Sequence, residues 1–172
     1  NKMTPHNTLI SVLLPVKNGG TYLQAAVHSL LEQTHQQLEI ILVDDHSSDN
    51  AIQQLKPNAR LKILKNNGSG VSAATTTAAQ HAQGDYLARM DGDDLALPQR
   101  LETQLNHLIE NPQLGLCGAQ VEIFTDTGPP AGGYARYQQW INALTKPQEI
   151  ADAIYIENPI PNPTVMFRRS TF

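Results

Sequence analysis

The stretch Leu38-Glu-Ile-Ile-Leu-Val-Asp-Asp45 carries the clearest signal for the fold. It opens with six residues that are almost all apolar and stops abruptly at two aspartates. A short apolar run of this kind is typical of a buried strand, because a strand covered on both faces needs no polar side. Further strands are predicted at residues 9–14, 60–64 and 85–90.

A segment with helical character follows each of these strands. Its apolar residues recur every three to four positions, or it opens with residues that cap helices. The predicted helices lie at residues 23–31, near 49–55, at 71–80 and at 98–110. Strand and helix therefore alternate four times. This order predicts an α/β fold in which a mostly parallel, Rossmann-like sheet has helices on both faces.

Beyond residue 114 the order of elements is looser. The sequence predicts a strand over 114–124, a Gly/Pro loop over 127–133, a helix over 147–156, an extended segment over 158–163 and a strand over 164–168. Tyr134, Tyr137 and Trp140 recur at helical spacing, which favours packing onto the sheet over stacking on a sugar ring. No repeat or internal boundary is visible, so a single domain over residues 1–172 is predicted.

The composition excludes several classes of protein. The 172 residues carry a formal net charge of -4 and no Lys/Arg block, which argues against nucleic-acid binding. The single Cys117 cannot form an internal disulfide and lies in an apolar run, so we expect a structural thiol and a cytoplasmic location. No apolar run reaches the roughly 20 residues of a membrane span, and no signal peptide is visible.

The polar loops that follow the four strands are expected to meet at one edge of the sheet. They comprise residues 15–20, 44–49, 66–70 and 91–94. In sheets of this kind, ligands bind outside the carboxyl ends of the strands. Each loop alone has an ordinary explanation, since an aspartate can simply solvate a strand end or cap the next helix. Four such loops at one edge favour a binding site.

The last of these loops is acidic, because Met90-Asp-Gly-Asp-Asp94 places three carboxylates within four positions. Like charges this close repel, so the cluster requires a cation, hydrogen-bond donors or solvent. A divalent ion with oxygen ligands is the natural partner, and Mg²⁺ or Mn²⁺ usually also holds a substrate phosphate. The loop therefore predicts metal-assisted handling of a phosphorylated ligand.

Other familiar sites do not fit the sequence. A calcium-binding EF-hand counted from Asp91 would put Leu95 where an oxygen ligand is needed and Ala96 where a glycine is needed. The P-loop pattern and the dinucleotide fingerprint Gly-x-Gly-x-x-Gly are absent. The six histidines form no compact metal motif, although His46 lies beside the predicted crevice.

Five motifs follow one another along the chain in an order that a known family shares. They are Ile10-Ser-Val-Leu-Leu-Pro-Val-Lys-Asn18, Ser29-Leu-Leu-Glu-Gln-Thr34, Glu39-Ile-Ile-Leu-Val-Asp-Asp45, Gly84-Asp-Tyr86, and Met90-Asp-Gly-Asp-Asp94 with Pro98 and Arg100-Leu-Glu102. This set resembles the family 2 glycosyltransferases, which have the GT-A fold. The segment 158–169 also looks like its counterpart in bacterial polysaccharide-building members.

The resemblance implies transfer of a sugar from a nucleotide diphosphate donor to an acceptor hydroxyl, with inversion at the anomeric carbon. Residues 9–123 would form the nucleotide-binding half, and residues 124–172 a partial acceptor-side region. A UDP-sugar is the favoured donor. A glycan or a lipid-linked sugar in cell-surface polysaccharide synthesis is the expected acceptor.

The resemblance also assigns roles to individual residues. Pro15 and Val16 would contact the nucleobase through their backbone, and Asp45 would accept a hydrogen bond from the base. Asp91 would lie near the ribose. Asp93 would be the main protein ligand of Mn²⁺ or Mg²⁺, with the next aspartate supporting the loop. The ion would stabilise the charge that develops on the leaving diphosphate.

Two departures from the family pattern concern the donor site. The stretch Ala74-Thr-Thr76 stands where members usually have Ala-Arg-Asn, and His46 stands where glycine is common. The family's general base belongs to a segment expected beyond Phe172. The chain is therefore expected to be C-terminally truncated and to transfer sugar weakly or not at all. Asp152 and Glu157 are expected on a solvated helix face rather than as substitutes.

Two alternatives to a glycosyltransferase stay open from the sequence. A nucleotidyltransferase that makes sugar nucleotides also combines such a sheet with acidic metal ligands, and Lys17-Asn-Gly-Gly20 is a thin version of its triphosphate loop. A non-catalytic module that binds nucleotides or sugars is the other alternative. Association with the inner face of a membrane would require missing segments or partners.

Overall fold

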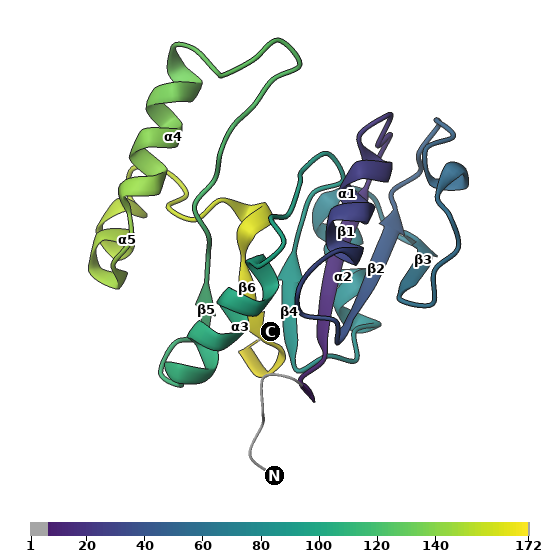
Figure 1. The fold of residues 1–172 in the computed structure, drawn as a ribbon, viewed down its shortest axis with the longest axis horizontal. Coiled ribbons are helices and arrows are strands. Elements are labelled where there is room, and N and C mark those ends of the chain that lie inside the picture. Colours follow the sequence, from purple (N-terminus) through teal and green to yellow (C-terminus); the bar gives the residue numbers. More distant parts are fainter. Residues whose placement is uncertain (1–6, 172) are drawn as a thin grey trace.

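The computed structural model describes residues 7–171, which are built around a mixed sheet (Figure 1). Its strands are β1 (Ile10–Val16), β2 (Leu38–Asp44), β3 (Leu61–Lys65), β4 (Tyr86–Arg89), β5 (Leu116–Cys117) and β6 (Met166–Arg168). They lie in the order β3-β2-β1-β4-β6-β5. β1 to β4 are parallel, whereas β6 runs antiparallel to both β4 and β5. The predicted α/β fold with a mostly parallel sheet is confirmed.

Helices connect the parallel strands and cover both faces of the sheet (Figure 1). The helices are α1 (Leu23–Leu31), α2 (Val71–Gln80), α3 (Arg100–Glu110), α4 (Gly133–Ala143) and α5 (Pro147–Ala153), and the short 3₁₀ turns are η2 (Ile52–Gln54), η3 (Asn162–Thr164) and η4 (Arg169–Thr171). In the described part of the chain, none of the helices has the length and apolar character needed to cross a membrane.

The core forms on the two faces of β1, because alternate residues of a strand point to opposite sides. Ile10, Val12 and Leu14 pack with the apolar residues of α1 and α3. Leu13 packs on the other face with Ala74 and its neighbours in α2. All seven residues of β1 are buried. The central strands are therefore covered on both sides, as their apolar sequences predict.

The helix predicted near residues 49–55 is shorter than expected, and only the 3₁₀ turn η2 forms there. The backbone becomes extended at Leu55, with φ −66° and ψ 134°. Pro57 lies two residues further on and disfavours a helical conformation in the residue before it. The segment predicted to be extended over 158–163 likewise ends in the turn η3.

The strand predicted over 114–124 is wrong for most of its length, since only Leu116 and Cys117 pair with β6. Beyond them the backbone finds other partners. The Asn142 side chain of α4 accepts from the Val121 backbone N–H at 2.8 Å and donates to its carbonyl at 2.7 Å. A side chain thus replaces the neighbouring strand, which the apolar pattern could not indicate.

The aromatic residues of α4 do not pack onto the sheet, contrary to the prediction. α4 lies away from the sheet, next to the segment that leads into it (Figure 1). Tyr134 is exposed, whereas Tyr137 and Trp140 are half-buried and face each other with ring centroids 6.0 Å apart. Ile141 is the buried apolar residue of this helix, and it is 4% exposed.

Candidate functional site

The loops after β1 and β2 are tied together at the carboxyl edge of the sheet, the upper edge in Figure 1. The Asn18 backbone N–H donates to Ser47 Oγ at 3.0 Å, and Asn18 Oδ1 accepts from the Ser48 N–H at 2.8 Å. The Gly20 N–H donates to Asp49 Oδ2 at 2.9 Å. Polar side chains predicted to meet at this edge are therefore brought together.

Asp45 joins the loop after β2 to the loop after β3. Its side chain is 3% exposed, and Oδ1 accepts from Asn66 Nδ2 at 2.7 Å. Both carboxylate oxygens also lie 3.0 Å from the Gly70 N–H. The Asn66 bond is the main cause that lowers the pKa of Asp45; burial opposes it and the Gly70 N–H supports it. Asp45 is thus an oriented, ionised carboxylate at neutral pH.

His46 adds a second bond between the same two loops. Its Nε2 lies 2.8 Å from the Gly68 carbonyl oxygen. A carbonyl only accepts, so Nε2 carries the proton in this contact. The His46 backbone has φ 59°, in the left-handed region that favours glycine. His46 is exposed to solvent.

Pro15 and Val16 are the last two residues of β1, and both are buried. The Val16 carbonyl accepts from the Asp45 N–H at 2.7 Å. Gly92 of the acidic loop lies against the other side of Val16, because a Cβ at Gly92 would be 3.1 Å from Val16 Cγ2. Val16 is therefore the point at which the loops after β1, β2 and β4 meet.

The three carboxylates of the acidic loop have different surroundings. The Asp94 N–H donates to the Asp91 carbonyl at 3.3 Å, which closes a turn. Asp91 is half-buried and pairs with Arg89, with 2.8 Å between Nη2 and Oδ1. Burial, with the charges of Asp91 and Asp93 adding to it, raises the pKa of Asp94 to about 6. Asp93 is exposed and has no hydrogen bond or ion pair with the described residues.

Asp93 therefore has the surroundings expected of a metal ligand with few protein partners. No three His, Cys, Asp or Glu side chains converge on one point within residues 7–171. A divalent ion held by Asp93 would thus take most of its ligands from phosphate and water. Mg²⁺ sites commonly have this composition, because the ion keeps several waters and binds few carboxylates.

Two arginines to which the sequence assigned no role lie against the acidic loop. Arg89 pairs with Asp91, and Arg100 Nη2 donates to the Arg89 carbonyl at 2.6 Å. Both charges act on Asp94, where they oppose the rise in its pKa. Their spacing of eleven residues gives no local signal. Only the position of Arg100 within the Arg-Leu-Glu motif could have indicated it.

The motif at the end of α1 anchors the chain that follows the acidic loop. Gln33 is fully buried, and its Nε2 donates to the carbonyls of Ala96 at 3.3 Å and Leu97 at 2.8 Å. Its Oε1 accepts from the Leu101 N–H at 3.0 Å. Ser29 Oγ accepts from the Ala96 N–H, also at 3.0 Å. These bonds fix the exit of the loop, so the motif has a structural explanation.

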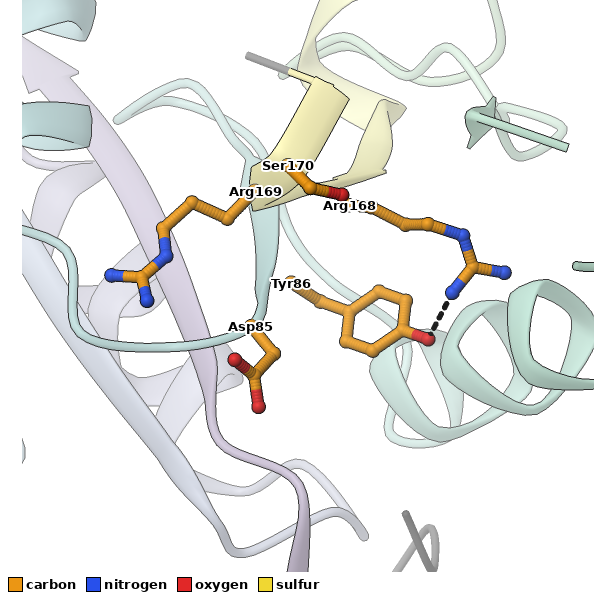
Figure 2. A pocket seen from close by; sticks show the side chains of 5 residues that line it. All are labelled: Asp85, Tyr86, Arg168, Arg169 and Ser170. Carbon is orange, nitrogen blue, oxygen red and sulfur yellow. Dashed lines mark hydrogen bonds between the residues drawn. The ribbon is translucent and has the colours of Figure 1, made fainter. Parts of the chain in front are cut away.

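Two cavities among the described residues lie away from this edge. One of about 310 Å³ is lined by Asp85, Tyr86, Arg168, Arg169 and Ser170 (Figure 2). There the Tyr86 hydroxyl accepts from Arg168 Nη1 at 2.5 Å. A second, apolar cavity of about 560 Å³ lies beside α4 and is lined by Ile123, Gly133, Tyr134 and Tyr137. None of these residues belongs to the four loops at the carboxyl edge.

Comparison with known proteins identifies the family. The family model described as Glycosyl transferase family 2 matches residues 11–171, nearly the whole chain. The chain belongs to glycosyl transferase family 2. The alternation of strands and helices and the ordered motifs therefore predicted the correct family.

Curated glycosyltransferases show the same relationship. An uncharacterized glycosyltransferase of Haemophilus influenzae is 30% identical over 171 residues, which are 95% of this chain and 53% of the relative. The UDP-Glc:alpha-D-GlcNAc-diphosphoundecaprenol beta-1,3-glucosyltransferase WfgD of Escherichia coli is 32% identical over 106 residues, 60% of this chain and 42% of WfgD. The chain therefore spans about half the length of the curated relatives it matches.

Solved glycosyltransferase structures share the fold. The mannosyltransferase PcManGT from Pyrobaculum calidifontis, solved with GDP-Man and Mn²⁺, has a TM-score of 0.66 and 19% identity over 94% of this chain and 44% of PcManGT. TarS 1–349 of S. aureus, solved with UDP-GlcNAc, has a TM-score of 0.59 and 20% identity over 94% and 45% of the two chains. The expected GT-A fold of this family 2 member is confirmed.

Proposed function

We propose that this family 2 member binds a nucleotide diphosphate sugar together with Mn²⁺ or Mg²⁺, and that it serves transfer of the sugar to an acceptor hydroxyl with inversion. The acidic loop carries the proposal. Asp93 is exposed and free of protein partners at the sheet edge where ligands of such folds bind. An exposed carboxylate without protein partners can bind a divalent cation whose other ligands come from a diphosphate.

The roles of the other residues follow the order of the loops along the edge. The backbone of Pro15 and Val16 is proposed to contact the nucleobase, and Asp45 to accept a hydrogen bond from it. The hydrogen bond from Asn66 supports this role, because it fixes the orientation of the Asp45 carboxylate. Asp91 is proposed to lie near the ribose. The nucleotide would then extend across the edge from the β2 loop to the β4 loop.

The cation would supply Lewis-acid stabilisation of the diphosphate that leaves when the glycosidic bond breaks. The chain's own contribution is orientation. Asp93 would hold the ion, while the turn from Asp91 to Asp94 and the bonds of Gln33 fix the loop before the donor arrives. A pre-formed site avoids the free-energy cost of ordering the loop on binding.

The relatives favour a UDP-sugar as donor and a polysaccharide precursor as acceptor. TarS was solved with UDP and UDP-GlcNAc, and the name of WfgD specifies UDP-Glc and a diphosphoundecaprenol-linked sugar. PcManGT was solved with GDP-Man and Mn²⁺. We propose that this chain acts in cell-surface polysaccharide synthesis, on a glycan or lipid-linked acceptor.

The general base that would deprotonate the acceptor is proposed to lie outside residues 7–171. Asp152 accepts a hydrogen bond from Gln148 at 2.7 Å on α5, and Glu157 accepts from the Asn158 N–H at 2.9 Å. Both are exposed, and α5 lies away from the parallel strands β1 to β3 (Figure 1). In this proposal residues 9–123 bind the nucleotide, and residues 124–172 contribute to the acceptor side.

Calorimetric titration of the chain with UDP, GDP and dTDP, each with and without Mn²⁺, tests the ligand. We expect metal-dependent binding, tightest for UDP, and weak or no transfer from a UDP-sugar. Absence of metal-dependent binding to all three nucleotides would refute the proposed ligand. Efficient transfer by the chain would refute the proposed position of the base.

A further inference from the structure

Arg89 ends β4 immediately before the acidic loop, and its side chain is only 15% exposed. Its Nη2 contacts Asp91 Oδ1 at 2.8 Å. Its Nη1 is buried and has no hydrogen-bond partner among the described residues. A buried guanidinium nitrogen without a partner is unusual, because leaving such a donor unpaired costs free energy. Fold stability therefore does not explain why an arginine lies here.

The backbone of Arg89 is held from two sides. Its N–H donates to the Val165 carbonyl at 2.8 Å, and its carbonyl accepts from Arg100 Nη2 at 2.6 Å. Arg100 is itself held, since its Nε donates to Gln104 Oε1 at 3.1 Å. The guanidinium that contacts Asp91 therefore stands on a fixed strand end. An ion pair built on a rigid element can orient its partner.

The helix that covers the same face of the sheet as Arg89 is α2, and it contributes no positive charge there. Arg89 is level with Leu13 in the parallel pairing, and Leu13 faces α2. The sequence of α2 has no charged residue. Thr75 of α2 donates its hydroxyl to the Val71 carbonyl at 2.8 Å. Arg89 thus supplies positive charge that α2 does not.

The contact leaves part of Asp91 available. Arg89 engages Oδ1, whereas Oδ2 has no hydrogen bond with the described residues. The Asp91 side chain is 35% exposed, so the carboxylate is partly accessible to solvent. A ribose hydroxyl can donate a hydrogen bond to such an oxygen. This hydrogen bond is strongest when the accepting carboxylate is charged and held in place.

We propose that Arg89 is a positioning residue for the donor nucleotide, and that its guanidinium holds Asp91 in the orientation in which it accepts from the ribose. This inference rests on the proposed function. Arg89 acts through Asp91 and does not contact the reacting atoms. Its positive charge also lowers the repulsion among the three carboxylates of the loop.

A double-mutant cycle on nucleotide affinity tests the inference. The parent chain, Arg89→Met, Asp91→Asn and the double variant are titrated with UDP in the presence of Mn²⁺, and with GDP or dTDP if the parent prefers them. We expect Arg89→Met to weaken binding about tenfold, as loss of a charged hydrogen bond does. The double variant should be no weaker than Asp91→Asn alone, because both changes remove one interaction.

Two further variants separate positioning from fold stability. Arg89→Lys keeps the charge and should recover part of the affinity. Arg136→Met removes one positive charge from exposed α4 and should leave both affinity and Tm unchanged. The affinity loss in Arg89→Met should persist at a temperature where circular dichroism shows the variant fully folded.

The outcomes are distinguishable from those of the proposed function. A parent chain that binds none of the nucleotides would overturn the proposed function and this inference together. A parent chain that binds, with Arg89→Met unchanged in affinity, would overturn the inference alone. Fully additive effects of Arg89→Met and Asp91→Asn would also overturn it, because Arg89 would then not act through Asp91.

Discussion

The three aspartates of the acidic loop show how surroundings separate residues that look alike in sequence. Asp91 is paired with Arg89, and Asp94 is half-buried, whereas Asp93 faces solvent without a partner. A cation can bind Asp93 without breaking an existing contact. This difference favours Asp93 over its neighbours as the metal ligand, the residue that the family resemblance also indicates.

Asp93→Ala is expected to abolish the dependence of nucleotide binding on Mn²⁺, because it removes the proposed protein ligand of the ion. The measurement is calorimetric titration with UDP at several Mn²⁺ concentrations. Asp152→Ala, an exposed carboxylate on α5, is the matched control and should bind as the parent does. An unchanged Mn²⁺ dependence in Asp93→Ala would contradict the assignment.

His46 carries backbone strain, because its φ of 59° is unfavourable for a residue with a Cβ. His46→Gly and His46→Ala both remove the bond to the Gly68 carbonyl, but only glycine relieves the strain. The glycine variant should therefore be about 1 kcal/mol more stable than the alanine variant. Urea unfolding of the two variants checks this. Equal stability would mean that the left-handed backbone costs nothing here.

Cys117 should react slowly with thiol reagents in the folded chain. Burial raises the pKa of its thiol to about 11, with the Gln104 side chain and Arg100 opposing the rise. A raised pKa lowers the fraction of thiolate, which is the reactive form, at pH 8. Modification by iodoacetamide should be at least about tenfold slower than in urea-unfolded chain, and accelerate towards pH 11. Equal rates in both states at pH 8 would contradict the burial.

The sequence could identify individual site residues that belong to a local motif. It could not identify which residues distant in the sequence contact them. Asp45 follows a strand, so its place at the edge is predictable from the parallel sheet. Its hydrogen bond to Asn66 depends on the conformation of the loop after β3. Arg89 faces Asp91 only because β4 ends between them, and no periodicity marks such a turn.

Among the elements, α1 has a second role besides covering the sheet. Its C-terminal end holds the chain between the acidic loop and α3 through Gln33. The glutamine side chain stands in for backbone partners that this irregular segment lacks. The position of the acidic loop is therefore set by an element that comes sixty residues earlier.

Gln33→Ala should destabilise the fold by about 1–3 kcal/mol, because the Leu101 N–H and the Ala96 carbonyl, both buried, lose the partners that Gln33 supplies. Nucleotide affinity should fall as well, since the loop loses its anchor. Urea unfolding and calorimetry measure the two effects. Gln53→Ala, at an exposed glutamine after β2, is the control and should change neither. Full nucleotide affinity in a destabilised Gln33→Ala would show that the loop does not need this anchor.

Elements with a strong apolar pattern were predictable, and elements fixed by irregular contacts were not. β1, β2, α1 and α2 match their predicted ranges closely, because buried strands and amphipathic helices leave a periodic signal. The segment 118–124 has a strand-like sequence, yet its backbone bonds to side chains of α4. Such a choice depends on tertiary contacts rather than on local sequence.

In the whole molecule, the sheet and the α4–α5 segment differ in how much apolar surface they bury. Every residue of β1 is buried, whereas α4 has one buried residue, Ile141, and α5 has one, Ala153. α4 is tied to the preceding segment mainly through Asn142 and Gln138. The free energy of local opening is low where few apolar contacts are lost. The molecule should therefore open in two stages.

Native-state hydrogen exchange should show this difference directly. Backbone amides of α4 are expected to open with a free energy at least about 2 kcal/mol below that of amides in β1. Asn142→Ala should accelerate exchange in α4 and leave β1 unchanged, because its bonds to Val121 serve only this segment. Met166→Ala is the contrasting variant, since Met166 is fully buried in β6 beside β4 and its loss should accelerate exchange throughout the sheet. Equal protection of α4 and β1 would mean that the α4–α5 segment opens only with the sheet.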